Sequence, residues 1–240
     1  MLPDRNILIA LRETGYSFES GTKMASMLAI DPASTRWEDF RNSWSRLGID
    51  THMADGGRYR RRRHSVFSAQ SGVIAREPHQ AHFQGLEFNP LNGGIQRWFE
   101  PMEGVVAEGA VLGSILAFVG DHVGALAPSA RRWKIEVHQF RIEASDGEVG
   151  QPTPEGMHRD GVDFVLVMLV DRVNITSGTT HLADPTGKAI GSFTLMTPLD
   201  SVLLDDRRVF HGVTAVLPED PAKPAWRDVL VVTFVSVDRS

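Results

Sequence analysis

The spacing of apolar and polar positions predicts helices in the first half of the chain. Four large apolar residues recur at helical spacing within residues 31–48, which predicts an amphipathic helix. A broader apolar stripe over residues 104–126, ended by Pro128, predicts a second helix, although Gly109 and Gly113 weaken it. These helices are expected to pack on a sheet formed further along the chain.

After Arg132 the pattern changes to short apolar runs separated by clusters of Gly, Pro, Asp and Ser, which is typical of strands and turns. Six strands are predicted, over residues 134–143, 163–170, 191–197, 201–204, 209–216 and 227–237. Because no helical pattern separates them, a sandwich or jelly roll is favoured over a parallel sheet with crossover helices. Residues 59–68 and 16–18 are candidates for additional edge strands.

Length and composition are those of an ordinary globular chain. It has 240 residues, of which 42% are apolar and 23% charged, enough to bury a sizeable core. We expect one domain over residues 1–240, with a helical and strand extension at 1–130 and a jelly-roll core at 131–240. The predicted fold class is α+β, mainly β.

Residue usage narrows the classes of function. Cysteine is absent, so thiolate nucleophiles and Cys-ligated centres are excluded, and any metal must be bound by His, Asp or Glu. The formal net charge of −5 argues against nucleic acid as a partner. The apolar run 7–11 is too short for a signal peptide, and no stretch reaches the roughly 18 apolar residues of a membrane span. We therefore expect a cytoplasmic protein with no membrane partner.

The segment PEGMHRDGVDFVLVML carries the clearest candidate chemistry. His158 and Asp160 stand two residues apart before an apolar strand, so in an extended chain their side chains lie on one face. His211, at the start of another apolar run, is the candidate third ligand. Two histidines and one carboxylate form the facial set that binds Fe(II) in oxygenases and leaves other coordination positions open.

Arg227 precedes an apolar strand in the segment AWRDVLVVTF. Burial of a guanidinium is costly without an anionic partner, and a carboxylate can satisfy it through two parallel hydrogen bonds. Strand alternation puts Thr233 on the same face, so its hydroxyl is a further candidate contact for a ligand bound there.

The segments MHRDGVDF, VFHGVTAV and WRDVLVVTF, with VHQFRI and GGRYRRRRHSVF upstream, resemble a family of bacterial 2-oxoglutarate and Fe(II)-dependent dioxygenases. That family includes the L-isoleucine 4-hydroxylase, related L-amino-acid hydroxylases and BsmA-type proteins. The resemblance in order, spacing and length extends over most of the chain. It implies a double-stranded β-helix, a cupin-like jelly roll of two sheets with the metal near one end of the barrel.

The resemblance assigns His158, Asp160 and His211 as iron ligands, and Arg227 as the partner of the distal 2-oxoglutarate carboxylate. It implies Fe(II), 2-oxoglutarate and O₂ as the cofactor and co-substrates. Asp160 is present where related halogenases carry Gly or Ala, so hydroxylation of an aliphatic C–H bond is expected, with release of succinate and CO₂. The expected substrate is a small free L-amino acid such as leucine, isoleucine or methionine.

Other polar residues are candidates for binding that substrate. In the run Arg58–Arg63, alternation turns Arg60 and Arg62 to one face, where one could bind the substrate carboxylate. A solvated basic strand edge and a nucleic-acid patch are the alternatives. Gln139 and Arg141 share a strand face and are candidates for substrate or co-substrate contact, or for structural hydrogen bonds.

The partner of the substrate ammonium stays open between Asp163 and backbone carbonyls near the metal-binding strand. Three other functions also stay open: the same chemistry on a peptide or carrier-bound amino acid, a non-catalytic jelly-roll binding protein, and a Zn or Mn hydrolase or isomerase. The sequence does not decide the oligomeric state, and a homodimer is compatible with it.

Overall fold

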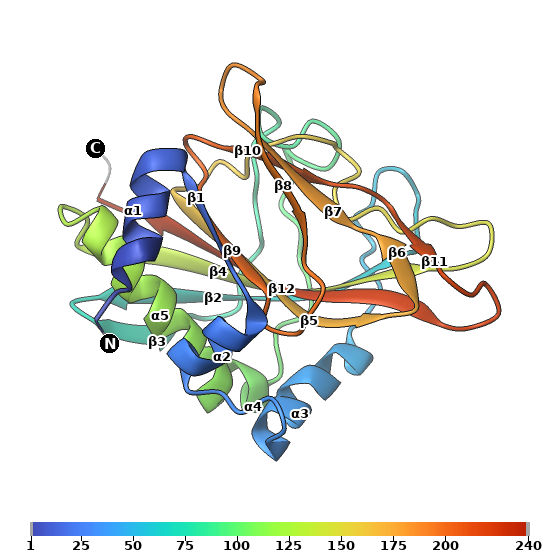
Figure 1. The fold of residues 1–240 in the computed structure, drawn as a ribbon, viewed down its shortest axis with the longest axis horizontal. Coiled ribbons are helices and arrows are strands. Elements are labelled where there is room, and N and C mark those ends of the chain that lie inside the picture. The colour runs from blue at the N-terminus through green and yellow to red at the C-terminus, as the bar shows by residue number, and fades with distance from the viewer. Residues whose placement is uncertain (1, 239–240) are drawn as a thin grey trace.

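The computed structural model describes residues 2–238 and is mainly β (Figure 1). Its helices are α1 (Arg5–Thr14), α2 (Gly21–Leu28), α3 (Thr35–Asn42), the 3-10 turn η1 (Ser43–Arg46), α4 (Gly104–Ala107) and α5 (Ala110–Leu126). Its strands are β1 (Tyr16–Glu19), β2 (Arg60–Gln70), β3 (Val73–Arg76), β4 (Arg132–Ala144), β5 (Phe164–Val173), β6 (Ile175–Ser177), β7 (Thr179–Ala183), β8 (Ala189–Thr194), β9 (Ser201–Asp205), β10 (Phe210–Val213), β11 (Val216–Pro218) and β12 (Ala225–Ser236). No helix among these described residues is long and apolar enough to cross a membrane.

The strands form one large sheet and two small ones. The seven-stranded sheet has the order β1-β9-β5-β12-β4-β2-β3, and all of its pairings are antiparallel. The small sheets are β10-β7-β8 and β11-β6. The strand order departs widely from the chain order, as expected for a jelly roll.

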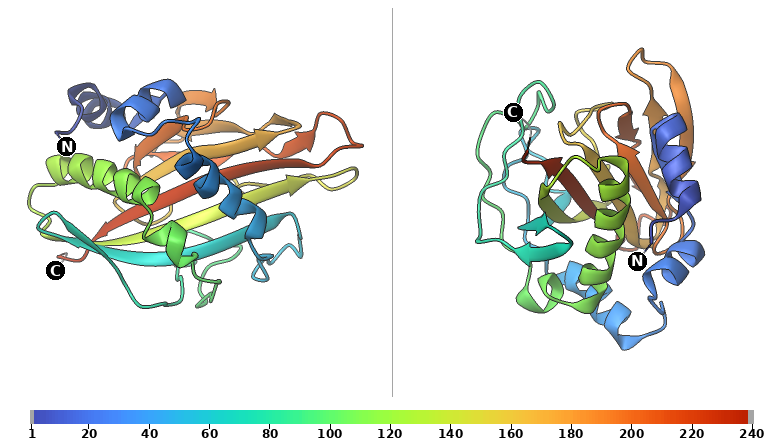
Figure 2. Two further views of the ribbon diagram at one scale, coloured as in Figure 1. Left: turned by 90° about the horizontal axis from the view of Figure 1, so that it is seen from below. Right: turned by 90° about the vertical axis from the view of Figure 1, so that its left-hand side faces the viewer.

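The helices cover one face of the large sheet (Figures 1 and 2), where the main hydrophobic core lies. Helix α1 shows how local sequence specifies one of them. The side chain of Asp4 accepts hydrogen bonds from the backbone N–H groups of Asn6 and Ile7, and Gly15 ends the helix in the left-handed conformation at φ 83°. Ile7 and Leu11 lie one turn apart and are both buried against the core.

Strand alternation gives the large sheet two different faces. On β12, Leu230, Val232 and Phe234 belong to the core beneath the helices. Val231 faces the other way and packs against the cluster that joins this sheet to the β10-β7-β8 sheet. This α+β arrangement, with N-terminal helices packed on one sheet of a jelly roll, confirms the predicted fold class.

Residues 77–103 connect β3 to α4 without a helix or strand. Within this segment an isolated antiparallel bridge joins His82 to Arg97, with N···O distances of 3.0 and 2.9 Å. Long irregular segments in compact domains are often functional loops.

The predicted helices are shorter than their apolar patterns. The helix predicted over 31–48 is α3 followed by η1, and the helix predicted over 104–126 is interrupted after α4. Gly109 is the N-cap of α5 and has an extended conformation at ψ 152°. The helix is therefore interrupted at a glycine that was expected to weaken it. Helices α1 and α2 were not predicted.

Each of the predicted strands corresponds to a strand of the structure, with differences in extent and position. The run 209–216 is two separate strands, β10 and β11, because residues 214 and 215 lie outside both. Strands β3, β6 and β7 were not predicted. The expectation that 59–68 forms an edge strand is wrong, because β2 pairs with β4 on one side and β3 on the other. The run 16–18 does belong to an edge strand, β1.

Candidate active site

A cavity of about 370 Å³ lies on the face of the large sheet that is turned away from the helices. This volume is within the roughly 300–1,000 Å³ range of small-molecule sites in proteins. Its walls come from β2, β4, β5, β10 and β12, and from the irregular segment 77–103. The cavity is lined by His158, Asp160, His211, Arg227 and Thr233, all five of which are candidates from the sequence.

The two histidines are held opposite each other by the backbone. An isolated antiparallel bridge joins His158 to His211, and each N–H donates to the other residue's carbonyl at 2.9 Å. The two rings are therefore neighbours, with centroids 4.4 Å apart. Nδ1 of His158 lies 3.0 Å from the carbonyl oxygen of Gly156. Because that carbonyl can only accept, the neutral His158 ring carries its proton on Nδ1 and presents a lone pair on Nε2.

Asp160 completes the group. Its Oδ1 is 3.6 Å from Nε2 of His158, and its Oδ2 is 3.5 Å from Nε2 of His211. The ligand atoms of the three residues all lie within 4.8 Å of one another. The same-face arrangement expected of His158 and Asp160 is therefore present, and His211 faces them inside the barrel.

The site's electrostatics favour a cation among these three side chains. Burial alone lowers the pKa of His158, but its hydrogen bond to Asp160 and the charges of Asp160 and Glu155 raise it to about 9. Burial and the charge of His158 lower the pKa of His211 to about 4. Burial raises the pKa of Asp160, but the hydrogen bond from His158 and the charge of His211 outweigh it and keep this carboxyl ionised.

The donor set fits Fe(II). Two imidazoles and a carboxylate on one side of a point leave further coordination positions for a chelating co-substrate and O₂. Nδ1 of His211 is buried without a hydrogen-bond partner among residues 2–238, so no protein group prevents Nδ1 from carrying the ring proton while Nε2 offers its lone pair.

Arg227 is a buried cation without a counter-ion. It is 2% exposed, and Nε and Nη2 have no hydrogen-bond partner within the described part of the chain. No carboxylate of residues 2–238 lies within 4.0 Å of it. Burial and the charge of Arg172 lower its pKa to about 10, so it remains a cation at neutral pH. Such a group in a cavity wall fits the distal carboxylate of the co-substrate 2-oxoglutarate.

The rest of the β12 wall has the expected order. Val229, Val231 and Thr233 line the cavity together with Arg227, as strand alternation predicts. Thr233 is 6% exposed, and its hydroxyl has no hydrogen bond to any group of residues 2–238, so this group can contact a bound ligand. The wall thus combines one cation, one hydroxyl and apolar surface.

The basic run on β2 is not a solvated edge. Arg60 and Arg62 are 6% and 5% exposed and line the cavity, whereas Arg61 and Arg63 point to the other face. A buried carboxylate, Asp50, pairs with both inward arginines, at 2.7 Å from Arg60 and 3.6 Å from Arg62. The guanidinium of Arg62 also lies over the ring of a phenylalanine, 3.6 Å from its centroid.

Three candidate substrate contacts lie outside the cavity, namely Gln139, Arg141 and Asp163. The cavity face of β4 carries Glu136, His138 and Phe140, so alternation turns Gln139 and Arg141 away from it.

Gln139 donates to the hydroxyl of Ser43 at 2.8 Å, and Arg141 forms a two-pronged ion pair with Asp228 at 2.7 and 2.8 Å. Asp163 accepts from the backbone of Ser236 at 2.8 Å. These side chains have structural partners instead of facing the cavity.

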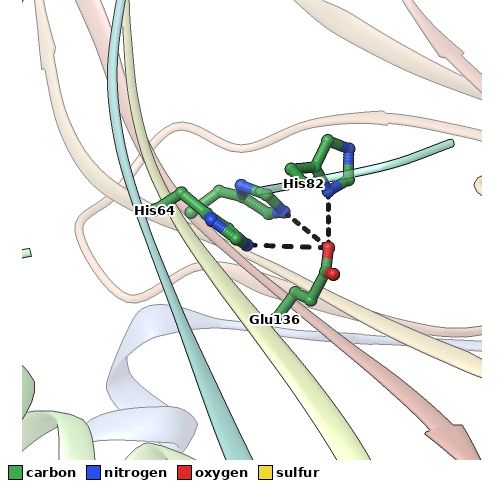
Figure 3. A group of neighbouring side chains, drawn as sticks. His64, His82 and Glu136 are labelled. Carbon is green, nitrogen blue, oxygen red and sulfur yellow. Dashed lines mark hydrogen bonds and ion pairs between the residues drawn. The ribbon is translucent and has the colours of Figure 1, made fainter. Parts of the chain in front are cut away.

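A second group of metal-ligand residue types lies close together (Figure 3), and three of its four members, His82, His138 and Glu136, line the same cavity. We call His64, His82, His138 and Glu136 the Glu136 cluster. Oε2 of Glu136 lies 2.5 Å from His82, and 3.7 Å from each of His64 and His138. Oε1 pairs with Lys134 at 2.6 Å. Burial raises the pKa of Glu136, but the neighbouring His138, His64 and His82 rings outweigh it and keep the carboxyl ionised.

A contact from Arg62 argues that this cluster is a hydrogen-bonded network. Nη2 of Arg62 lies 2.8 Å from Nδ1 of His138. Because a guanidinium can only donate, Nδ1 of His138 accepts, and the neutral ring carries its proton on Nε2. That N–H faces Glu136 and cannot offer a lone pair to a metal. The facial group around Asp160 has no such obstacle.

Several residues of the site are not among the candidates from the sequence. Arg97 and Gln84 reach the cavity from the segment 77–103, and Glu155 does so from the loop before His158. Gln84 donates to the backbone carbonyl of Asp160 at 3.2 Å. These segments have no apolar period, so the sequence offered no signal for the direction of their side chains.

Asp206 was also missed, and it supports the backbone of the ligand Asp160. Its carboxylate accepts from the backbone N–H groups of Asp160, Gly161 and Val162 at 2.9, 2.9 and 3.1 Å. Burial and the charge of Asp160 raise the pKa of Asp206 to about 6.

Asp206→Asn should therefore weaken metal binding by roughly 10- to 100-fold, the usual cost of losing a group behind a ligand. It should also lower the free energy of unfolding by about 1–3 kcal/mol, because backbone donors lose acceptors. Asp200→Asn is the matched control, since Asp200 accepts three backbone N–H groups at 2.7, 2.8 and 2.8 Å elsewhere. Metal titration and urea unfolding separate the effects. Equal metal affinity in both variants would contradict this supporting role.

A jelly roll with a facial His-Asp-His group and an unpaired arginine in one cavity defines the class of non-haem Fe(II) and 2-oxoglutarate oxygenases. The family model described as 2OG-Fe dioxygenase matches residues 41–233. The chain belongs to this family. The family requires Fe(II), 2-oxoglutarate and O₂.

Known relatives agree with this assignment. The chain is 37% identical to a bsmA homolog of Methylobium petroleophilum PM1, with a TM-score of 0.89 over 98% of this chain and 95% of that one. The structure of IDO from Bacillus thuringiensis is 18% identical, with a TM-score of 0.79 over 97% and 95% of the two chains. The 3(1)-hydroxy-L-isoleucine 4-dioxygenase of Pantoea ananatis is 22% identical over 93% of each chain. The predicted family and the double-stranded β-helix are confirmed, and the protein is a 2-oxoglutarate and Fe(II)-dependent dioxygenase.

Proposed function

We propose that this dioxygenase hydroxylates an aliphatic C–H bond of a small free L-amino acid. The observation that carries the proposal is the single cavity that joins the His158, Asp160 and His211 group to the unpaired Arg227. The relative that acts on 3(1)-hydroxy-L-isoleucine supports an amino acid as substrate.

In the proposed mechanism His158, Asp160 and His211 hold Fe(II), and Arg227 and Thr233 hold the distal end of the co-substrate 2-oxoglutarate. When bound, Fe(II) and 2-oxoglutarate would supply the oxidising chemistry. 2-Oxoglutarate and O₂ would be converted to succinate and CO₂, and one oxygen atom would enter the substrate. Arg227 restricts the co-substrate to one orientation, which leaves the rest of the cavity for the molecule to be oxidised. Asp160 would supply one of the metal ligands, which favours hydroxylation over halogenation.

The apolar part of the cavity suits a substrate with an aliphatic or thioether side chain. Phe88, Val162, Val167 and Val213 line it beside the metal-binding group. Such a wall binds apolar groups and excludes water from the reacting carbon. Leucine, isoleucine and methionine are the substrates we expect.

The test is succinate release by protein loaded anaerobically with Fe(II), then supplied with O₂ and 2-oxoglutarate. We expect an aliphatic or thioether L-amino acid to stimulate release well above the rate without it, and to gain one oxygen atom by mass spectrometry. The same residue within a peptide, or with its carboxylate amidated, should give no stimulation. Equal turnover of the peptide would reject the free amino acid and favour a peptide substrate.

A further inference from the structure

Arg97 is a second buried cation in the cavity that lacks a counter-ion. It is 2% exposed, and the bridge from its backbone to His82 holds it in the wall. Its side chain has no ion pair within 4.0 Å and no hydrogen bond to any group of residues 2–238, and its Nε is buried without a partner. The guanidinium lies 5.8 Å from the centroid of the Phe99 ring.

The neighbouring charges do not neutralise Arg97. Arg60 and Arg62 line the same cavity, and both already share the one carboxylate of Asp50. Of these three guanidinium groups, only those of Arg60 and Arg62 form an ion pair with a carboxylate of residues 2–238. Burial and the charge of Arg60 lower the pKa of Arg97, and they outweigh the charges of Asp50, Glu155 and Glu136, which raise it.

Glu155 is the complementary group. Its side chain is 8% exposed, and Oε1 lies 3.4 Å from Nε2 of His158. Oε2 is buried and has no hydrogen-bond partner among the described residues. Glu155 lines the same cavity as Arg97, yet no ion pair within 4.0 Å joins the two. A buried carboxylate normally has a partner, so this free oxygen indicates a cationic ligand.

We infer that Arg97 binds the α-carboxylate, and Glu155 the α-ammonium, of a free α-amino acid. An unpaired cation and an unpaired anion that are too far apart to pair can both be satisfied by one zwitterion between them. Because Glu155 lies against His158, the ammonium end is held beside the metal-binding group. The side chain of the amino acid is then left to contact the apolar wall. This inference rests on the proposed function and names the residues that select its substrate.

The sequence suggested Arg60 or Arg62, in the basic run on β2, as the group that binds the substrate carboxylate. The structure favours Arg97 for this role. Arg60 and Arg62 line the positive end of the cavity, but their ion pairs with Asp50 partly neutralise their charges. Arg97 retains its full capacity for a two-pronged contact with a carboxylate. Arg227 serves the co-substrate in the same way, so the cavity offers one unpaired guanidinium to each of two small acids.

The test compares Arg97→Gln and Glu155→Gln with the Fe(II)-loaded wild type. The probes are L-leucine, L-isoleucine and L-methionine, each as the free acid, the amide and the N-acetyl derivative. In the wild type, the amide and the N-acetyl form should both bind worse than the free acid. Arg97→Gln should raise the KM for the free acid by at least about 30-fold and abolish the preference for acid over amide. Glu155→Gln should abolish the preference for the free amine over the N-acetyl form.

The controls separate recognition from folding and from co-substrate binding. Arg61→Gln and Glu143→Gln break a partly exposed ion pair of 2.8 Å on the other face of the sheet, and both should behave as wild type. In Arg97→Gln the KM for the co-substrate should change far less than the KM for the amino acid. Arg97→Lys keeps the charge and should recover part of the preference for acid over amide.

Three results would overturn the inference. The first is an unchanged acid-to-amide preference in Arg97→Gln. The second is a rise confined to the KM for the co-substrate, which would assign Arg97 to 2-oxoglutarate. The third is loss of iron in Glu155→Gln, which would make Glu155 a metal ligand. Failure of every free amino acid to stimulate the wild type would instead reject the proposed function itself.

Discussion

His158→Ala should reduce turnover below detection while the protein stays folded. The variant removes one of the three ligands that face the cavity, so iron affinity should fall by more than the roughly 10- to 100-fold typical of losing a residue behind a ligand. The backbone bridge between His158 and His211 does not depend on the side chain. The free energy of unfolding of the metal-free protein should fall by about 1–3 kcal/mol, because the hydrogen bond to Gly156 is lost and the carboxylates of Asp160 and Glu155 lose a buried partner.

The number of Fe(II) ions bound per chain checks this prediction. It also tests whether the Glu136 cluster binds metal. Wild type should bind one Fe(II) per chain and His158→Ala none at the same concentration. His82→Gln, which alters the Glu136 cluster, should still bind one, because the contact from Arg62 makes His138 a donor to Glu136. Two metal ions in wild type, with one left in each variant, would show that the Glu136 cluster binds metal.

Strand alternation accounts for most of what the sequence could predict of the site. His158 and Asp160 share a face because they are two residues apart in an extended segment, and Arg227 and Thr233 share a face of β12 for the same reason. These relations depend only on local backbone geometry. The partnership of His158 with His211 depends on a bridge between distant segments. Ligand chemistry and the family resemblance suggested it, and chain spacing alone did not.

The site residues that the sequence did not predict lie in irregular segments, which have no hydrophobic periodicity. Arg97 faces the cavity because its backbone is bridged to His82 within a long irregular segment. Glu155 follows a run of Pro and Thr residues, in a loop whose conformation no local pattern specifies. In both cases the direction of the side chain is set by tertiary contacts.

The interpretation of Arg60 and Arg62 as possible edge residues failed for a related reason. A run of arginines suggests solvent, since burial of a charge is costly. Here the carboxylate of Asp50, on the chain before β2, offsets that cost by pairing with both side chains. The pairing crosses a loop, and the sequence pattern contains no indication of it.

Arg227→Met should raise the KM for the co-substrate 2-oxoglutarate by at least about 30-fold, because the distal carboxylate loses a buried charged partner. Arg227→Lys should give a smaller rise, since it keeps the charge but loses the planar fork. The same Met variant should make the co-substrate-free protein more stable, by roughly 1–3 kcal/mol, because an unpaired buried cation is replaced by an apolar side chain of similar length. Steady-state kinetics and urea unfolding without 2-oxoglutarate measure the two effects.

The opposite signs of these two effects distinguish a ligand-binding arginine from a structural one. Arg46 is the matched control, because it forms a two-pronged contact with Glu103 at 2.7 and 2.9 Å outside the cavity. Arg46→Met should lose up to about 1 kcal/mol of stability, as expected for an exposed pair, and leave the KM for the co-substrate unchanged. If Arg227→Met were destabilised in the same way and bound 2-oxoglutarate normally, Arg227 would be a structural residue. Saturating 2-oxoglutarate should reverse the order of stability in the iron-loaded proteins, because only wild type gains the full binding free energy.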